Sequence, residues 1–76
     1  MPHVILKLQS GRSEEQKKKI AEELTKTVMI NAKCPEEAVS VSIEDIEADD
    51  WVHRVYKPDI IGKAGLLYKK PGYDPL

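Results

Sequence analysis

The residue with the most unusual chemistry in this chain is Pro2, which directly follows Met1. Methionine is normally removed when a residue as small as proline follows it, so we expect Pro2 to become the N-terminus. An internal proline nitrogen is an amide without a proton, whereas a terminal one is a secondary amine. An α-amino group has a pKa of about 7.7–8.0, and apolar surroundings or a nearby cation favour its uncharged form. Such an amine suits general acid–base catalysis near neutral pH.

A second candidate for chemistry is Arg12, ten residues after Pro2. A guanidinium group stays charged and binds a carboxylate through two parallel hydrogen bonds. Taken alone, an arginine at this position is more often a loop residue that faces solvent. Three tyrosine hydroxyls are able to donate a hydrogen bond to a ligand oxygen, and their spacing selects none of them: Tyr56, Tyr68 and Tyr73.

The length of the chain, 76 residues, predicts a single domain over residues 1–76 that gains buried area from a second copy. So short a chain buries only a modest fraction of its surface, and the lone Cys34 cannot form an intramolecular disulfide. Regular packing or oligomerisation remains as a source of stability. We therefore expect a homo-oligomer.

The formal net charge of −1, with acids and bases interspersed, argues against nucleic-acid and membrane-surface partners. The chain contains no apolar run of transmembrane length and no stretch typical of a signal peptide. With a single free thiol, this indicates a cytoplasmic protein. No Cys/His spacing typical of a zinc site is present.

The elements that must position these residues are a strand, a long helix and a second strand. Residues 3–9 are rich in aliphatic side chains and predict a strand. Ser13 and Gln16 form a capping box that begins a helix, and Pro35 requires that helix to end by about residue 33 or 34. Residues 39–44 alternate strictly and predict a second strand with Val39 directed inward. A helical crossover of this length joins parallel neighbours.

After Ile46 the pattern weakens. Asp49 and Asp50 are able to cap a short helix that carries Trp51, and Lys57-Pro58 is expected to break it. For residues 58–70 the sequence does not distinguish helix, hairpin and coil.

The chain resembles the tautomerase superfamily, of the 4-oxalocrotonate tautomerase type. The resemblance rests on Pro2, the short apolar strand, Gly11-Arg12-Ser13, the helix start at Glu15-Gln16-Lys17 and the Val-x-Val-x-Ile strand. The resemblance is specific over residues 2–46. The ending, residues 69–73, is more similar to a longer-chain subgroup of small tautomerases. The resemblance implies an α/β (α+β) fold in which two β-α-β units form a four-stranded sheet backed by two helices, as a dimer or a trimer of dimers.

The resemblance also implies roles for particular residues. Pro2 would shuttle a proton between two carbons of an α-keto acid or related enol, and Arg12 would bind the substrate carboxylate, often from a neighbouring subunit. Trp51 falls where the family places an aromatic residue that walls the pocket, although a core or interface tryptophan is nearly as common. Ser40 stands where the family type enzyme carries a second arginine. Gln9 replaces an aliphatic pocket residue.

The sequence therefore predicts a cofactor-independent keto–enol tautomerase without a metal, acting on a small carboxylate. Pro2 is the predicted catalytic residue. The predicted substrate-binding residues are Arg12, Trp51 and Ser40. Because Ser40 removes one cation, phenylpyruvate-like enols with one carboxylate are the expected substrates. Two alternatives stay open: a non-catalytic oligomeric binding module, and a hydratase or dehalogenase that would use His53, two residues after Trp51, as a base.

Overall fold

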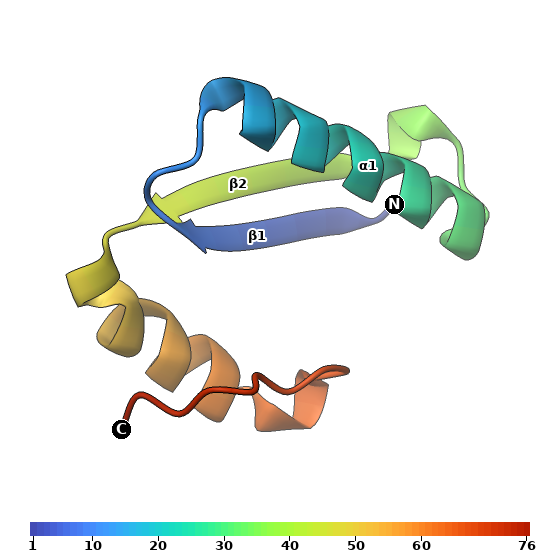
Figure 1. Ribbon diagram of the computed structural model, residues 1–76. Coiled ribbons are helices and arrows are strands. Elements are labelled where there is room, and N and C mark those ends of the chain that lie inside the picture. Colours follow the sequence, from blue (N-terminus) through green and yellow to red (C-terminus); the bar gives the residue numbers. More distant parts are fainter.

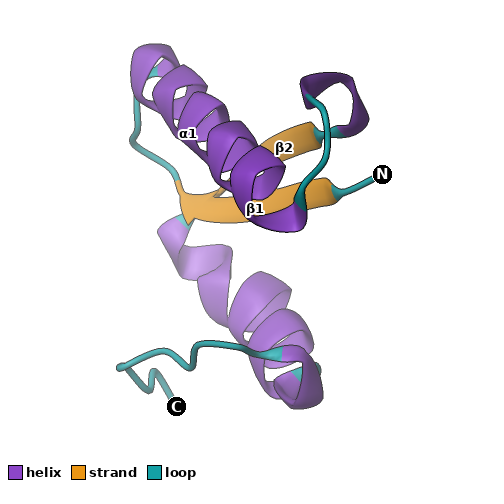
Figure 2. Cartoon of the chain, turned by 90° about the vertical axis from the view of Figure 1, so that its right-hand side faces the viewer, coloured by secondary structure: helices purple, strands orange, loops and turns teal.

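The computed structural model describes residues 1–76 and places two parallel strands between two helical layers (Figures 1 and 2). Strand β1 (His3–Gln9) pairs in parallel with β2 (Ser40–Ile46), and Gln9 lies opposite Ile46. The predicted strand–helix–strand order is confirmed. The second strand begins one residue later than expected, at Ser40, and continues to Ile46.

Helix α1 (Glu14–Ala32) joins the two strands and begins at the predicted capping box. The backbone N–H of Gln16 donates to Ser13 Oγ at 3.1 Å, and the backbone N–H of Ser13 donates to Gln16 Oε1 at 2.8 Å. At the other end Lys33 adopts a left-handed conformation with φ 55°, which closes the helix before Pro35. A short 3-10 turn, η1 (Glu36–Ala38), leads into β2.

One face of the sheet packs against α1 through aliphatic side chains such as Leu6 and Ile43, and an ion pair joins Lys17 to Asp45 at 2.8 Å. No residue of α1 is buried. A helix of this length needs more apolar surface than two short strands supply. The stripe of apolar side chains by which α1 packs against the sheet therefore remains half exposed in the single chain.

The C-terminal segment, drawn below the strands in Figure 1, lies over part of the opposite face of the sheet and leaves Ile5 on that face 64% exposed. This segment comprises η2 (Ala48–Asp50), η3 (Val52–Ile61), η4 (Ala64–Leu66) and an irregular tail to Leu76. The three buried residues of the chain, Ile46, Val55 and Tyr56, lie where η3 meets the end of β2. The densest packing thus sits beside the cavity described below.

The expectation that Lys57-Pro58 ends the helix was wrong, because η3 is a π-helix that continues to Ile61. In an α-helix the proline ring clashes with the carbonyl group four residues earlier. A π-helix is wider, and its hydrogen bonds span five residues, as in the bond from Gly62 N–H to the Lys57 carbonyl oxygen at 2.8 Å. A Cβ atom on Gly62 would lie 2.5 Å from the Pro58 carbonyl oxygen, so glycine is required there.

No helix of the chain combines the length and the apolar character needed to cross a membrane.

Candidate active site

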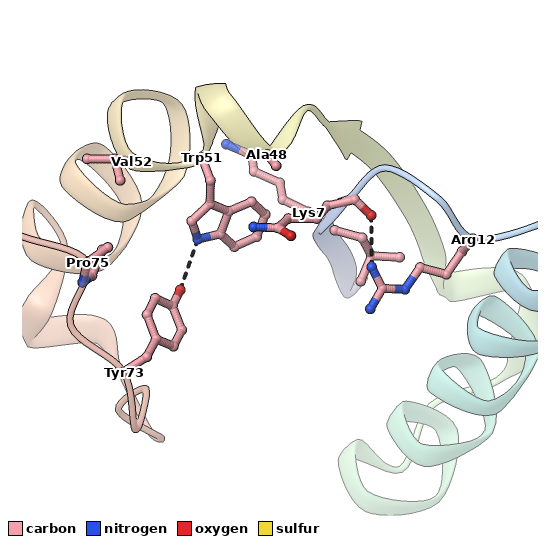
Figure 3. A pocket seen from close by; sticks show the side chains of 9 residues that line it. Lys7, Arg12, Ala48, Trp51, Val52, Tyr73 and Pro75 are labelled. Carbon is pink, nitrogen blue, oxygen red and sulfur yellow. Dashed lines mark hydrogen bonds between the residues drawn. The ribbon is translucent and has the colours of Figure 1, made fainter.

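A cavity of about 470 Å³ opens at the carboxyl end of β1, between the turn that leads into α1 and the C-terminal segment (Figure 3). Residues from three regions line it. They are Lys7, Leu8 and Gln9 from β1, Arg12 from the turn, and Ala48, Trp51, Val52, Tyr73 and Pro75 from the C-terminal segment. Two of the four predicted site residues, Arg12 and Trp51, are therefore brought to one place.

The turn between β1 and α1 fixes Arg12 at the cavity. Gly11 has φ 129°, a conformation that side-chain-bearing residues rarely adopt. The chain turns at Gly11, and the next residue, Arg12, lines the cavity. Arg12 Nη1 donates to the Gln9 carbonyl oxygen at 2.9 Å (Figure 3). Since a guanidinium carries five N–H donors, most of them stay available for an anion.

Trp51 forms the central wall of the cavity, and the tail residue Tyr73 is attached to it (Figure 3). Trp51 Nε1–H donates to Tyr73 Oη at 2.9 Å. The Tyr73 ring also packs against the buried Tyr56, with 5.7 Å between the ring centroids and 45° between the ring planes. Trp51 therefore belongs to the cavity rather than to the buried core.

An ion pair between Lys7 and Asp59 ties η3 to the sheet beneath the cavity. Each side chain keeps only about a quarter of its surface exposed, with 29% for Lys7 and 25% for Asp59. The hydrogen bond from Lys7, and to a smaller extent Lys63, lowers the pKa of the Asp59 carboxyl below its usual range against the opposing effect of burial. The ionised pair therefore stabilises the docking of the C-terminal layer.

Replacing Asp59 by Asn is expected to lower the free energy of unfolding at pH 7 by about 1 kcal/mol, the upper end of the range for a solvent-accessible ion pair. A carboxyl with a lowered pKa in the folded state stabilises above its unfolded pKa, and this contribution disappears as the pH falls through the folded pKa. Urea unfolding at fixed protein concentration should therefore separate wild type from Asp59→Asn at pH 7, and the difference should shrink as the pH falls toward the lowered pKa of Asp59. A pH-independent difference would contradict the role of the ion pair.

The other two predicted residues, Pro2 and Ser40, lie at the opposite end of the strands. The backbone N–H of Ser40 donates to the Pro2 carbonyl oxygen at 3.2 Å, and the Ser40 hydroxyl hydrogen-bonds His3 Nδ1 at 2.7 Å. Seven residue steps separate Pro2 from Gln9, which spans roughly 23 Å in a strand. Within one chain Pro2 and Ser40 therefore do not meet Arg12.

The candidate base His53 lies outside the cavity lining, and so does the neighbouring charged residue Arg54. His53 is exposed, and its Nε2 lies 3.9 Å from Asp50 Oδ1. Arg54 donates to Glu44 at 2.7 Å. Gln9 does line the cavity, and it adds the polar character that the sequence predicts. No three His, Cys, Asp or Glu side chains gather in a way that would hold a metal ion.

Sequence reasoning did not select Lys7, Tyr73 or Pro75 as lining residues. Lys7 could have been predicted, because it lies two residues before Gln9, and side chains two residues apart lie on the same face of a strand. Tyr73 and Pro75 could not have been predicted from the sequence, because their position depends on how an irregular tail folds back.

The parallel β-α-β unit is the fold of a small isomerase of the tautomerase class, as in solved 4-oxalocrotonate tautomerases. The chain belongs to the tautomerase family: the family model described as "Tautomerase enzyme" matches residues 2–56.

Relatives support this assignment over the whole length of the chain. A probable tautomerase of Xylella fastidiosa is 42% identical over 76 residues, which is 100% of this chain and 93% of the relative. Tautomerase PptA of Pectobacterium carotovorum is 38% identical over 74 residues, covering 96% of this chain and 97% of the relative. A solved 4-oxalocrotonate tautomerase isozyme from Methylibium petroleiphilum superposes with a TM-score of 0.64 at 36% identity, over 66% of this chain and 81% of its own.

Proposed function

We propose that the chain is a keto–enol tautomerase whose active site is shared between two copies, with Pro2 of one copy facing Arg12 and Trp51 of the other. The observation that carries this proposal is the separation of the predicted residues. Arg12 and Trp51 line one cavity, whereas Pro2 lies at the far end of β1. A second copy supplies the missing amine.

The free edge of β1 offers a route to this assembly. The sheet has only two strands in the order β1-β2, so the outer edge of β1 has no backbone partner. The midpoint of His3–Gln9 is Leu6. In an antiparallel pair of β1 strands centred there, Pro2 lies opposite Ser10 of the second copy, next to Gln9 and the cavity.

The shape of the single chain also favours a partner. Its radius of gyration is 13.9 Å, against about 11 Å for a compact domain of this length. Only three residues are buried, while Ile5 and Ile30 are 64% and 73% exposed. A four-stranded sheet backed by two helices would cover the half-exposed stripe of α1. Dimer and trimer of dimers are both compatible with this pairing.

The chemistry follows from the amine and the guanidinium. Arg12 holds the substrate carboxylate, and Trp51 supplies an apolar wall that favours the uncharged amine. The Pro2 nitrogen takes the proton from the carbon beside the carbonyl. The C–H electron pair forms the new C=C double bond and the C=O π pair moves onto the oxygen. The charged amine then gives its proton to that oxygen, which yields the enol and restores the uncharged amine. The reverse reaction returns the proton from the charged amine to carbon, and the same amine can return it to a different carbon of an extended enol.

The substrate class follows from two features. The cavity has a single arginine, and Ser40 stands where the family type enzyme carries a second arginine. We propose aryl enol-pyruvates, which carry one carboxylate and an apolar ring. The expected kcat/KM on such a compound exceeds that on an enol dicarboxylate by about tenfold. Spectrophotometric assays of both compounds with the same preparation test this, and faster turnover of the dicarboxylate would overturn the substrate class.

The mature N-terminus gives an independent check. The Met1 side chain is fully exposed, so the first peptide bond is accessible for processing. Intact mass spectrometry of the protein from its native cells is expected to show a chain that lacks Met1. If Met1 is retained, the nitrogen of Pro2 is an amide, and the non-catalytic binding module becomes the better description.

A further inference from the structure

The tail residue Tyr73 lies at the end of the cavity away from Arg12, with Trp51 between them (Figure 3). It lies outside residues 2–56, where the family model matches. The proton transfer proposed above does not use its hydroxyl group. Tyr73 is 48% exposed in the single chain, so a bound molecule can reach it.

The hydrogen bond to Trp51 determines what the Tyr73 hydroxyl can offer. An indole N–H is a donor only, so Tyr73 Oη must be the acceptor of the 2.9 Å bond. The phenolic proton is then free, and the chain provides no acceptor for it. A hydroxyl that accepts one hydrogen bond becomes a better donor in the next. The distal end of the cavity therefore presents one polarised O–H donor.

The donor is held in place by two contacts with different directions. The indole fixes the hydroxyl, and the Tyr56 ring, itself only 8% exposed, packs against the Tyr73 ring. An oriented donor loses little conformational entropy when a ligand binds. It can therefore discriminate between ligands that do and do not provide an acceptor.

We propose that Tyr73 is a specificity-determining residue that donates a hydrogen bond to a neutral oxygen at the end of the substrate remote from the carboxylate. With Arg12 at one end and Trp51 along the side, the preferred ligand is an aryl carboxylate with an oxygen substituent para to its side chain. This inference rests on the proposed function, and it names the substrate class of the same site more closely.

A neutral oxygen fits this end of the cavity better than a second carboxylate. The nearest lining cation is Lys7, and Asp59 already neutralises it. A carboxylate placed there would lose its hydration without gaining a counter-charge, which is unfavourable. A single phenolic donor matches an ether or hydroxyl oxygen.

The test uses two unreactive carboxylates, cinnamate and 4-methoxycinnamate, whose methoxy oxygen only accepts hydrogen bonds. Wild type is expected to bind the methoxy compound more tightly. Tyr73→Phe is expected to lower this affinity ratio about fivefold, the value of one neutral hydrogen bond. Tyr68→Phe is the matched control, because Tyr68 is fully exposed and does not line the cavity, so its ratio should equal that of wild type. An unchanged ratio in Tyr73→Phe would overturn the proposal.

A second comparison guards against loss of the tail in Tyr73→Phe. Wild type should bind 4-methoxycinnamate more tightly than the 3-methoxy isomer, which has the same atoms with the oxygen displaced. Equal binding of the two isomers also overturns the proposal. Both measurements are of binding and need no proton transfer by Pro2. A result against Tyr73 therefore leaves the tautomerase proposal standing, and the reverse holds for an inactive Pro2.

Discussion

Replacing Pro2 by alanine is expected to lower kcat/KM for an aryl enol-pyruvate by about 10²-fold, the lower range for loss of a positioned acid–base group. The mature variant begins with a primary amine on a freely rotating residue. The ring that orients the lone pair is lost, and with it the alignment that proton transfer to carbon requires. The effect should fall on kcat more than on KM, since Arg12 still binds the carboxylate.

The comparison is valid only if both proteins have the same N-terminal processing. Alanine is also small enough for removal of the preceding methionine, so intact masses should show Met1 absent from wild type and variant alike. Circular dichroism and the oligomeric mass should agree between the two, because position 2 precedes β1 and contributes its carbonyl, not its side chain, to the strand pairing. A rate equal to that of wild type would show that Pro2 is not the base.

Local rules were enough for the first two thirds of the fold. The Ser13–Gln16 capping box and the stop before Pro35 are decided by residues a few positions apart, and both are confirmed. The parallel pairing of β1 and β2 follows from the length of the helical crossover. Only the start of β2 differed, by one residue, which is within the fraying typical of element ends.

The C-terminal third depended on contacts that no local pattern encodes. Pro58 is a strong α-helix breaker, and the wider π-helix removes the reason for the break. Tyr73 could not be preferred over Tyr56 or Tyr68 from spacing alone. Its selection depends on a hydrogen bond to Trp51, 22 residues earlier in the chain. Hydrogen-bonded pairs so far apart in the chain produce no periodic pattern in the sequence from which they could be predicted.

The candidate site shows a different limit of sequence reasoning. The resemblance gathered Pro2, Arg12, Trp51 and Ser40 into one set, and a single chain places them in two groups at opposite ends of β1. Residue types and order along the chain do not state which copy supplies each member. Our proposal that two copies share the site rests on the length of β1 and on its unpaired edge.

A shared site predicts that two inactive variants restore each other. Pro2→Ala and Arg12→Ala should each be nearly inactive alone. When equal amounts are mixed, dissociated and reassembled, a site is intact only if its proline comes from an Arg12→Ala chain and its arginine from a Pro2→Ala chain. Random assembly gives about one quarter of wild-type activity, for a dimer and for a trimer of dimers alike. Steady-state rates before and after subunit exchange measure this recovery.

The matched control is a chain that carries both substitutions, mixed with wild type in equal amounts. A site shared between chains is then intact in about one quarter of cases, whereas a site within one chain is intact in about one half. The two mixtures should therefore show the same activity if the amine and the guanidinium come from different copies. No recovery in the first mixture, with half activity in the second, would place Pro2 and Arg12 in the same chain. That result would require a rearrangement of β1, because a seven-residue strand separates them in the folded chain.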